Sequence, residues 1–491
     1  MGDRNKILEE SLLVKDGGVE RQEQGRVVVV GLRWQVLVPE LKQVCYIAGP
    51  MVAVTLLQYL LQVICLMMVG HLDELSLSST AIAISLSSVS GYIVLLGMAS
   101  ALETLCGQAY GAQEYHKLGI ETNTAIFCSL LFSIPLSVLW IFMGKLLVLI
   151  GQDPAISHKA GTFLACLTPG LFGHAVLQPL IRYYQVQSLV IPLLIGSGVA
   201  LCIHVPLCWA LVNKTGLGNN GAAFAMCISI WLNAIFLGVY MKISSVCAKT
   251  RAPFTREAFR GVGKFFRFAI PSALMICLES WSFELVVLLS GLLPNPEIET
   301  SVLSVCLTTI STLFSVANAL GAAVSTRVSN ELGAGNPQGA RIAVYVVMSL
   351  AMIETLALSS ILFACRSFFG YAFSNDEKVV NYVTKMTPLV CISVILDSLL
   401  GTLSGVSRGC GWQHIGAYIN LGAYYLLGVP AAAILGFPLN LRGYGLWIGV
   451  QLGSSVQIVL LAIVTSCTNW EKQVNKARER IFEGRSEVDK V

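Results

Sequence analysis

Charge is scarce in this sequence. Only 12% of its 491 residues are Asp, Glu, Lys or Arg, against about 25% in a typical soluble domain. Hydrophobic residues make up 55% of the chain, and the mean hydropathy is +0.72. This composition excludes an ordinary soluble protein and indicates a membrane protein with many spans.

Motifs of several enzyme classes are also missing. The sequence has no GxxxxGK[ST] phosphate-binding loop, so ATP is not expected to drive its activity. The segment Gly216–Gly221 fits the pattern GxGxxG, but it follows an apolar span rather than a strand, which argues against a dinucleotide site. No Ser/His/Asp arrangement suggests nucleophilic catalysis. We therefore expect neither enzymatic activity nor a bound cofactor.

Cysteine is present but not patterned. The 15 cysteines are scattered singly through apolar stretches, without a CxxC pair. No Cys/His spacing typical of metal ligands stands out, so no metal site is expected. Most of these cysteines are expected to be small, buried, reduced side chains.

What the sequence does contain is apolar runs of about 20 residues or more, long enough to cross a bilayer. Twelve are expected, at residues 44–69, 78–103, 122–150, 160–181, 189–212, 221–246, 265–291, 301–326, 340–371, 380–406, 414–436 and 443–467. The first 43 residues lack the apolar core and cleavage site of a signal peptide, so the first span is expected to be an uncleaved anchor. The expected fold class is an all-α membrane protein with twelve transmembrane helices.

Positive charge gathers in three segments. Lys and Arg concentrate before the first span, between the sixth and seventh spans, and after the twelfth. With twelve spans these segments share one side, which the positive-inside rule makes cytosolic, so both termini are expected in the cytosol. Because the segments flank membrane spans, they suit contact with membrane lipid rather than nucleic acid. Asn213 begins a glycosylation sequon on the opposite face, and its modification stays open.

The two halves of the chain resemble each other. At a nearly constant offset of about 220 residues, Pro50 matches Pro271, and Gly111-Ala112 matches Gly333-Ala334. Six spans per half give both halves the same orientation, so we expect two parallel six-helix lobes related by a pseudo-two-fold axis, as in many transporters. The expected domains are a tail at 1–43, an N-lobe at 44–247, a linker at 248–264, a C-lobe at 265–467 and a tail at 468–491.

Two acidic residues lie deep in expected spans of the second half. They are Glu279 and Asp397, and neutral amides, Gln58 and Gln178, stand at the matching places in the first half. A charge at the centre of a membrane helix costs roughly 2.5–3.5 kcal/mol by insertion scales and usually marks a functional site. Burial disfavours the charged form of a carboxyl group. We therefore predict that Glu279 and Asp397 form a proton-sensitive site.

Other residues are candidates for contact with a substrate. Gln58 and Gln178 can offer hydrogen bonds, while Trp281 and Phe314 can offer aromatic faces to an organic cation. Glu284 lies about 140° further round the helix than Glu279, so it is expected to face a neighbouring helix. For each of these residues, plain helix packing is the alternative. His174, His204 and Glu354 are weaker candidates.

Several longer strings resemble those of a known family. Met68–Leu72, Cys106–Ala112, Gly151–Pro154, Leu288–Pro296, Thr326–Gly335 and Arg408–Gln413 are similar to segments of the multidrug and toxic compound extrusion (MATE) family, and in particular of its plant DETOXIFICATION branch. The similarity covers about residues 35–480. It implies a twelve-helix, two-lobe fold and antiport driven by an ion gradient.

The resemblance also implies roles for residues. The family's acidic residues in spans seven and ten correspond to Glu279 and Asp397. Many bacterial members carry an Asp in span one, where this chain has Cys65, so a carboxylate mechanism in the N-lobe is not expected. Plant relatives often have two Trp after the span-seven Glu, whereas Ser280-Trp281 stands here, which affects the expected pocket beside Glu279.

The expected function is that of a monomeric, proton-coupled antiporter. It would export organic cations, secondary metabolites or xenobiotics from the cytosol across the plasma membrane or the vacuolar membrane. Its partners would be a small organic substrate, H⁺ and membrane lipid. A Na⁺-coupled exporter and a lipid-precursor flippase remain as alternatives, although a flippase would need cationic residues along its cavity for phosphate. A channel is a further alternative outside the transporter class.

Overall fold

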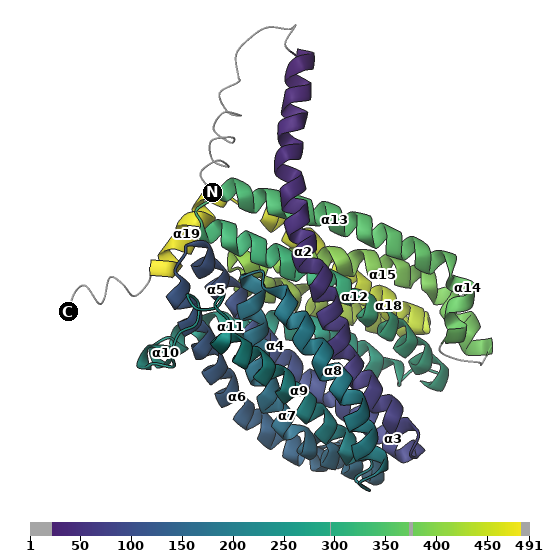
Figure 1. The fold of residues 1–491 in the computed structure, drawn as a ribbon. Helices are drawn as coiled ribbons and strands as arrows, with labels where there is room; N and C mark the ends of the chain where they lie inside the picture. Colours follow the sequence, from purple (N-terminus) through teal and green to yellow (C-terminus); the bar gives the residue numbers. More distant parts are fainter. Residues whose placement is uncertain (1–21, 295, 373–376, 483–491) are drawn as a thin grey trace.

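The computed structural model describes residues 22–294, 296–372 and 377–482, and these residues are almost entirely helical (Figure 1). The elements are α2 (Gln22–Gly70), α3 (Glu74–Ser87), the π-helix η2 (Ser88–Tyr92), α4 (Ile93–Ala99), α5 (Ala101–Gly111), α6 (Tyr115–Leu149), α7 (Pro154–Val186), α8 (Val190–Asn213), α9 (Asn219–Ile243), α10 (Arg256–Arg260), α11 (Val262–Ser290), α12 (Pro296–Gly333), α13 (Pro337–Ala364), α14 (Arg366–Phe369), the 3-10 helix η3 (Gly370–Ala372), α15 (Glu377–Cys410), α16 (Gln413–Asn420), the π-helix η4 (Leu421–Gly428), α17 (Val429–Gly436), α18 (Arg442–Ser466) and α19 (Trp470–Phe482).

Twelve stretches of these described helices are long and apolar enough to cross a membrane, as the sequence predicted. The second stretch joins α3, η2, α4 and α5 into one span, and the eleventh joins α16, η4 and α17. Several spans extend beyond the predicted limits. The first runs over Trp34–Gly70 rather than 44–69, and the second runs to Gly111 rather than 103. Helical hydrogen bonds continue where apolar character stops, so hydropathy alone sets the ends too early.

Part of each expected tail belongs to the described residues. Residues 22–43 of the expected N-terminal tail belong to α2, whereas residues 1–21 lie outside the described residues. The expected C-terminal tail contains the helix α19, which has buried Val474 and Ala477 on one face. Residues 483–491 lie outside the described residues.

The spans pack as two bundles. In the N-terminal bundle, α7 packs against α6 and α9, while α8 packs against α2 and α9. In the C-terminal bundle, α15 lies at the centre and packs against α12, α13 and α18. The short helix α10 lies in the connection between the bundles. The glycines and prolines of one half of the sequence therefore lie in a different bundle from their counterparts in the other half.

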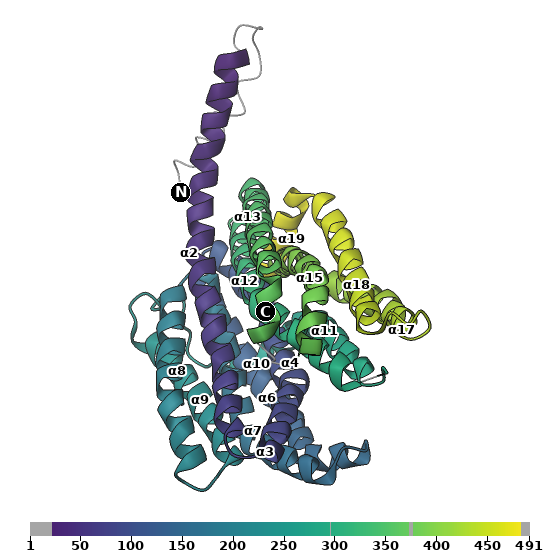
Figure 2. The same cartoon turned by 90° about the vertical axis from the view of Figure 1, so that its right-hand side faces the viewer.

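The bundles meet at one end and spread apart toward the other. They are joined near α5 and α19, and they separate toward α3 and α14 (Figure 1; Figure 2). The contacts between bundles run from α12 to α5 and α2, and from α11 to α4. Close backbone approach needs small residues here: a side-chain carbon added at Gly97 of α4 would lie only 2.6 Å from the Ala273 Cα atom of α11. The end at which the bundles meet is called the junction below.

Candidate functional site

The two predicted acids meet inside the C-terminal bundle. Glu279 lies on α11 and Asp397 lies on α15. The Asp397 side chain is buried, with 5% of the residue exposed, and it interacts electrostatically with Glu279. The Gln457 amide of α18 donates to Glu279 Oε2 over 3.4 Å. Three helices therefore bring polar groups together between their packed faces.

A π-helix contributes to this acid pair. Tyr424 lies in η4, is fully buried and interacts electrostatically with both Glu279 and Asp397. Its hydroxyl lies 3.1 Å from Ser454 Oγ of α18. Asn420, at the end of α16, donates to the Met275 carbonyl over 2.7 Å and also faces Glu279. A π-helix widens the helix turn and frequently occurs at functional sites, and here it carries the tyrosine to the acids.

The side chains around the acids are incompletely hydrogen-bonded. Asp397 Oδ2, Asn420 Oδ1 and Gln457 Oε1 are buried and have no hydrogen-bond partner among the described residues. The Nε2 and Oε1 atoms of Gln451 on α18 are likewise buried without a hydrogen-bond partner among the described residues. Because buried polar groups are nearly always paired, such atoms call for a water molecule, an ion or a ligand. The acid pair therefore lies beside buried acceptors that can still receive hydrogen bonds.

Neither acid forms an ion pair with a basic side chain among the described residues. The cation that Glu279 senses electrostatically is Arg408, and the Arg408 Nε atom is bonded to Glu103 over 2.8 Å. A carboxyl group in a medium of low dielectric constant favours its neutral form when no cation compensates it.

The junction contains a buried carboxylate of the opposite kind. Glu103 on α5 is fully buried, and it is flanked by Arg182 of α7 at 3.1 Å and by Arg408 of α15 at 2.8 Å. A second bridge links the bundles at the side of α2, where the Arg327 guanidinium grips Glu40 through two bonds of 2.7 and 2.9 Å. In each of these bridges a guanidinium group compensates the charge of a buried carboxylate.

Hydrogen bonds at the junction follow the duplication of the sequence. The Gln108 amide donates to the Gly409 carbonyl over 3.2 Å, and the matching Asn330 amide donates to the Val186 carbonyl over 3.0 Å. A methyl group added at Gly111 would collide with the Asn330 carbonyl, and one added at the matching Gly333 would collide with the Gln108 carbonyl. The pseudo-symmetric pairs thus lie across the boundary between the bundles.

A seam of small residues joins the acid pair to the junction. On α15, Gly401, Gly405 and Gly409 follow Asp397 at intervals of four residues, so they line one helix face. Carbons added at these glycines would lie against the α12 residues Ala317, Gly321 and Ser325, respectively. Small residues at such spacing let helix backbones approach closely in membranes. Between Asp397 and the junction, these glycines let α15 pack directly against the backbone of α12.

The predicted substrate residues lie in different places. Trp281 of α11 donates its indole N–H to the Val89 carbonyl of η2 over 3.1 Å, so it links the two bundles. Glu284 is exposed, and Phe314 on α12 is partly buried. In the N-terminal bundle, Gln178 is buried on α7, and Gln58 on α2 has a buried Nε2 atom with no partner among the described residues. The acid pair and these two amides thus belong to different bundles.

The weaker candidates have structural partners. His174 lies against Tyr92, with ring centroids 4.6 Å apart. Glu354 accepts a bond of 2.8 Å from Ser398, and His204 lies 2.8 Å from Ser229. The sequence did not single out Gln457, Tyr424, Asn420 or Glu103 as site residues. An amide or acid within a span was the available signal for Gln457 and Glu103, but Glu103 fell at the expected end of its span.

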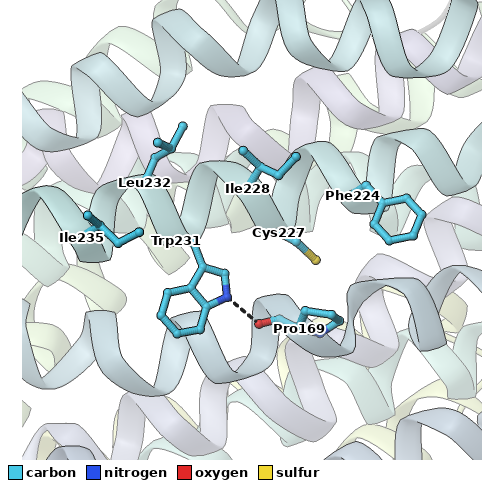
Figure 3. Close-up of a pocket in the computed structure, with 7 residues that line it drawn as sticks. All are labelled: Pro169, Phe224, Cys227, Ile228, Trp231, Leu232 and Ile235. Atoms are coloured by element: carbon cyan, nitrogen blue, oxygen red, sulfur yellow. Dashed lines mark hydrogen bonds between the residues drawn. The ribbon is translucent and has the colours of Figure 1, made fainter. Parts of the chain in front are cut away.

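A shallow apolar groove lies elsewhere, on the N-terminal bundle. Its lining comes from Pro169 on α7 and from Phe224, Cys227, Ile228, Trp231, Leu232 and Ile235 on α9 (Figure 3). The groove encloses about 340 Å³. The Trp231 indole donates to the Pro169 carbonyl over 2.9 Å, which satisfies its polar atom. None of the predicted site residues lines this groove, so it is separate from the acid pair.

The chain matches a known protein family over most of its length. The MatE family model matches residues 50–210 and 271–434, more than half of the chain. Protein DETOXIFICATION 12 of Arabidopsis thaliana is 56% identical over 481 residues, which cover 98% of this chain and 99% of that protein. Protein DETOXIFICATION 10 of the same plant is 57% identical over 442 residues, covering 90% and 91%.

Solved structures show the same fold. The crystal structure of the eukaryotic MATE transporter AtDTX14 is 56% identical, covers 91% of this chain and 100% of its own, and superposes with a TM-score of 0.88. A multidrug resistance MATE family transporter in an outward-facing conformation gives a TM-score of 0.76 at 15% identity, over 90% of this chain and 97% of its own. At that identity the second likeness concerns the fold alone.

Proposed function

Because this chain belongs to the MatE family of multidrug and toxic compound extrusion transporters, which are not enzymes, we propose that it is a proton-coupled antiporter. It exports organic cations, secondary metabolites or xenobiotics from the cytosol in exchange for H⁺. One observation carries the choice of ion: Asp397 is buried and interacts with Glu279, and neither acid takes part in an ion pair among the described residues. Burial disfavours the ionised form of such carboxyl groups, so access of water to them controls whether they release a proton.

The coupling path runs along α15. Asp397 and Arg408 are eleven residues apart on this helix, which places them on nearly the same face and about 16 Å apart along the axis. Ionisation of the acid pair favours solvent entry and repulsion between Glu279 and Asp397, whereas protonation favours closure. The glycine seam against α12 lets α15 shift with little steric resistance. A shift of α15 loosens the bond between Arg408 and Glu103 at the junction.

The junction is proposed to be the cytosolic gate. The basic segments that follow α9 and α18 lie at this end, where Lys264 donates to the Arg480 carbonyl of α19 over 3.0 Å. The positive-inside rule assigns such an end to the cytosol, so both termini are cytosolic in the plasma membrane or the vacuolar membrane. The bundles are joined at the gate and apart at the far end (Figure 2), an arrangement suited to substrate release.

Substrate is proposed to bind between the bundles of the monomer. Gln58 and Gln178 would offer hydrogen bonds from the N-terminal bundle, and Trp281, Phe314 and Glu284 would offer aromatic faces and a charge from the other. The Nε2 atom of Gln58, which has no hydrogen-bond partner in the described part of the chain, supports this role. The Trp281 indole is bonded to Val89, so its ring is held in place for stacking.

Transport by purified protein in liposomes tests the proposal. Ethidium serves as a fluorescent organic cation, and an imposed proton gradient drives its movement. Each pH unit is worth about 1.36 kcal/mol per proton, which supports about a tenfold ethidium gradient for one-for-one exchange. Asp397→Asn and Glu279→Gln are expected to abolish gradient-driven accumulation while leaving ethidium binding in place. If Asp397→Asn kept full coupled transport, the proposed role of the acid pair would be wrong.

A matched control is available in the same bundle. Glu299 on α12 is also buried, but it accepts hydrogen bonds from the Tyr382 hydroxyl at 2.7 Å and from the Gly443 amide at 3.1 Å. The carbonyl oxygen of a glutamine can accept both bonds, so Glu299→Gln is expected to keep proton-driven transport. Loss of coupling in this variant as well would point to general damage from removing a buried acid.

The same liposomes distinguish the alternatives. A Na⁺ gradient at equal pH on both sides is expected to drive no ethidium movement, and accumulation under that condition would favour the Na⁺-coupled exporter. A lipid-precursor flippase needs unpaired cations to hold phosphate. The buried arginines Arg182, Arg327 and Arg408 are all paired to glutamates, which disfavours that function.

A further inference from the structure

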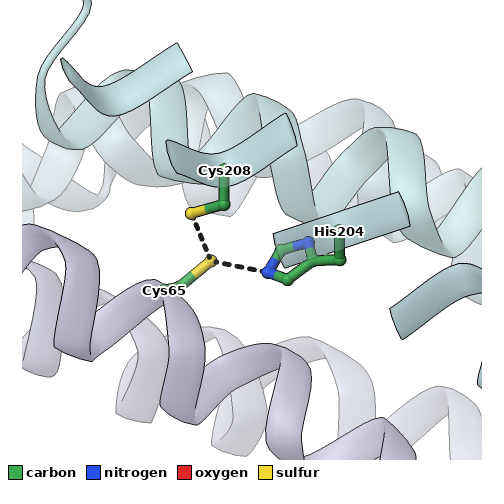
Figure 4. A group of neighbouring side chains, drawn as sticks. All are labelled: Cys65, His204 and Cys208. Carbon is green, nitrogen blue, oxygen red and sulfur yellow. Dashed lines mark hydrogen bonds between the residues drawn. The ribbon is translucent and has the colours of Figure 1, made fainter. Parts of the chain in front are cut away.

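A second cluster of chemically active side chains lies inside the N-terminal bundle. Cys65 comes from α2, and His204 and Cys208 come from α8 (Figure 4). Cys65 Sγ is 3.5 Å from His204 Nε2 and 4.0 Å from Cys208 Sγ. All three ligand atoms lie within 4.8 Å of one another, and all three side chains are fully buried. The acid pair and its bundle take no part in this cluster.

The sequence did not mark His204 and Cys208 as a pair of metal ligands, although they stand four residues apart. This spacing places them on one face of a helix, one turn from each other. Their third companion, Cys65, is 139 residues from His204 in the chain. Only the packing of α2 against α8 brings it within reach.

The hydrogen bonds of the cluster set the orientation of the imidazole. The Ser229 hydroxyl donates to the Ala225 carbonyl over 2.8 Å, which leaves its oxygen lone pairs facing His204 Nδ1, also at 2.8 Å. His204 therefore donates from Nδ1, and its Nε2 atom is the acceptor that faces Cys65 Sγ at 3.5 Å. A hydrogen-bonded partner on the far nitrogen is the usual support of a metal-binding histidine.

The spacing of the three atoms fits a bound metal ion. With Zn–S bonds of about 2.3 Å and a Zn–N bond of about 2.0 Å, a tetrahedral ion holds two sulfur atoms about 3.8 Å apart and a sulfur and a nitrogen about 3.5 Å apart. Here Cys65 Sγ lies 4.0 Å from Cys208 Sγ and 3.5 Å from His204 Nε2, and the ligand atoms of Cys208 and His204 lie within 4.8 Å of each other. The Ala222 carbonyl oxygen accepts a hydrogen bond from the Cys65 thiol over 3.5 Å.

We propose that Cys65, His204 and Cys208 form a Zn²⁺ site that ties α2 to α8 within the N-terminal bundle. Thiolate and imidazole ligands suit Zn²⁺ and Cu⁺ alike, and charge decides between them. Two thiolates neutralise Zn²⁺ fully, whereas Cu⁺ would leave a net negative charge at a fully buried position in the membrane, where charge is expensive. Binding displaces both thiol protons, so affinity rises with pH.

A disulfide between the cysteines is the competing use of the same atoms. It would join Cys65 to Cys208 but give no role to the His204 ring or to the serine that orients it. The Nε2 acceptor that faces Cys65 Sγ is what favours metal binding. Such a site would fix the distance between two helices of one bundle without touching the junction or the acid pair.

Metal analysis of the intact purified protein tests the proposal. After equilibration with Zn²⁺ and a weak competing chelator, the protein is expected to retain about one Zn²⁺ per chain. Cys65→Ser, Cys208→Ser and His204→Ala are each expected to reduce retention at least tenfold. Cys128→Ser is the matched control, because Cys128 is a buried cysteine on α6 of the same bundle, and it is expected to retain the metal.

Two further measurements complete the test, and the first of them needs no variant. Co²⁺ in the wild-type protein is expected to give thiolate charge-transfer absorption and the intense visible bands of tetrahedral coordination. Ser229→Ala keeps all three ligands and is expected to weaken Zn²⁺ binding about 10–100-fold through loss of orientation. Co²⁺ spectra without thiolate bands would overturn the site, as would equal Zn²⁺ retention by the cysteine variants. Binding of Cu⁺ that Zn²⁺ cannot displace would overturn the choice of metal.

Discussion

Glu103 and Asp397 are both buried carboxyl groups within membrane-spanning helices, yet their surroundings are opposite. Glu103 lies between the guanidinium groups of Arg182 and Arg408. Asp397 has an acid, Glu279, as its charged neighbour, and one of its oxygens has no hydrogen-bond partner among the described residues. Burial is therefore common to both sites, and the partner decides what burial does. Two arginines hold a carboxylate charged, whereas a second acid favours exchange of a proton.

The contrast separates a structural charge from a switching one. A paired buried charge is costly to disturb, because removing one partner strands the other in a medium of low dielectric constant. An unpaired acid gains little from its surroundings, so its loss is tolerated by the fold and felt in function. The same substitution, acid to amide, should then give opposite results at the two sites. Five variants test this comparison, and their expected effects on stability fall from Glu103→Gln to Asp397→Asn.

Glu103→Gln is expected to have the largest effect. It leaves the Arg182 and Arg408 guanidinium groups buried without a counter-charge, which costs about 3–5 kcal/mol. Unfolding by titration with sodium dodecyl sulfate in mixed micelles measures the free energy. The control is Lys159→Gln, which breaks the partly exposed pair with Asp73 and should leave the unfolding midpoint unchanged. If Glu103→Gln unfolded like the wild type, the junction charges would be dispensable.

Gly111→Ala comes next, because the added methyl group would collide with the Asn330 carbonyl across the junction. Overpacking of this kind costs about 1–3 kcal/mol. Gly333→Ala should cost a similar amount, since its methyl group would meet the pseudo-symmetric Gln108 carbonyl. The same unfolding titration measures both variants.

Gly238→Ala is the control for both glycine variants. Gly238 lies inside α9 with open space around its Cα atom, and alanine is the better helix former by about 1 kcal/mol. It should be neutral or stabilising. A large cost at Gly111 with none at Gly333 would show that the two halves do not share the junction equally.

Trp281→Phe is expected to have a smaller effect. It removes the bond from the indole N–H to the Val89 carbonyl between the bundles and keeps most of the ring, for a loss of about 0.5–1.5 kcal/mol. In the liposome assay we expect weaker binding of ethidium, with the coupling of transport to protons preserved. Trp209→Phe, on the exposed side of α8, should change neither property. Loss of coupling in Trp281→Phe would move this residue from substrate contact to the proton pathway.

Much of this arrangement was accessible from the sequence. Twelve apolar runs predicted the spans, and the depth of Glu279 and Asp397 within them marked the acids that the structure brings together. Both inferences rest on the cost of polar groups in lipid, which acts on each residue separately. The duplication of glycines and prolines predicted two halves of the same orientation, but not that Gly111 and Gly333 would each face the backbone of the other half across the junction.

What the sequence missed depends on packing between distant segments. Glu103 was taken as the end of a span, because nothing local shows that Arg182 and Arg408 will reach it. Tyr424 gained its place through a π-helix, and an insertion of this kind leaves no mark in hydropathy. Cys65 met His204 and Cys208 only through the contact of α2 with α8. Residue type and spacing could nominate such groups but could not assemble them.

Asp397→Asn should have the smallest effect on stability and therefore divides the two regions most sharply. The substitution preserves shape, and Asp397 Oδ2 has no hydrogen-bond partner among the described residues. We expect a change below about 1 kcal/mol in the unfolding titration, together with the loss of proton-driven transport. Glu103→Gln and Asp397→Asn compared in one experiment share the same chemistry and a similar burial. Equal destabilisation by both would mean that Asp397 is held by the fold as firmly as Glu103, and an acid held in that way could not serve as the exchangeable proton site.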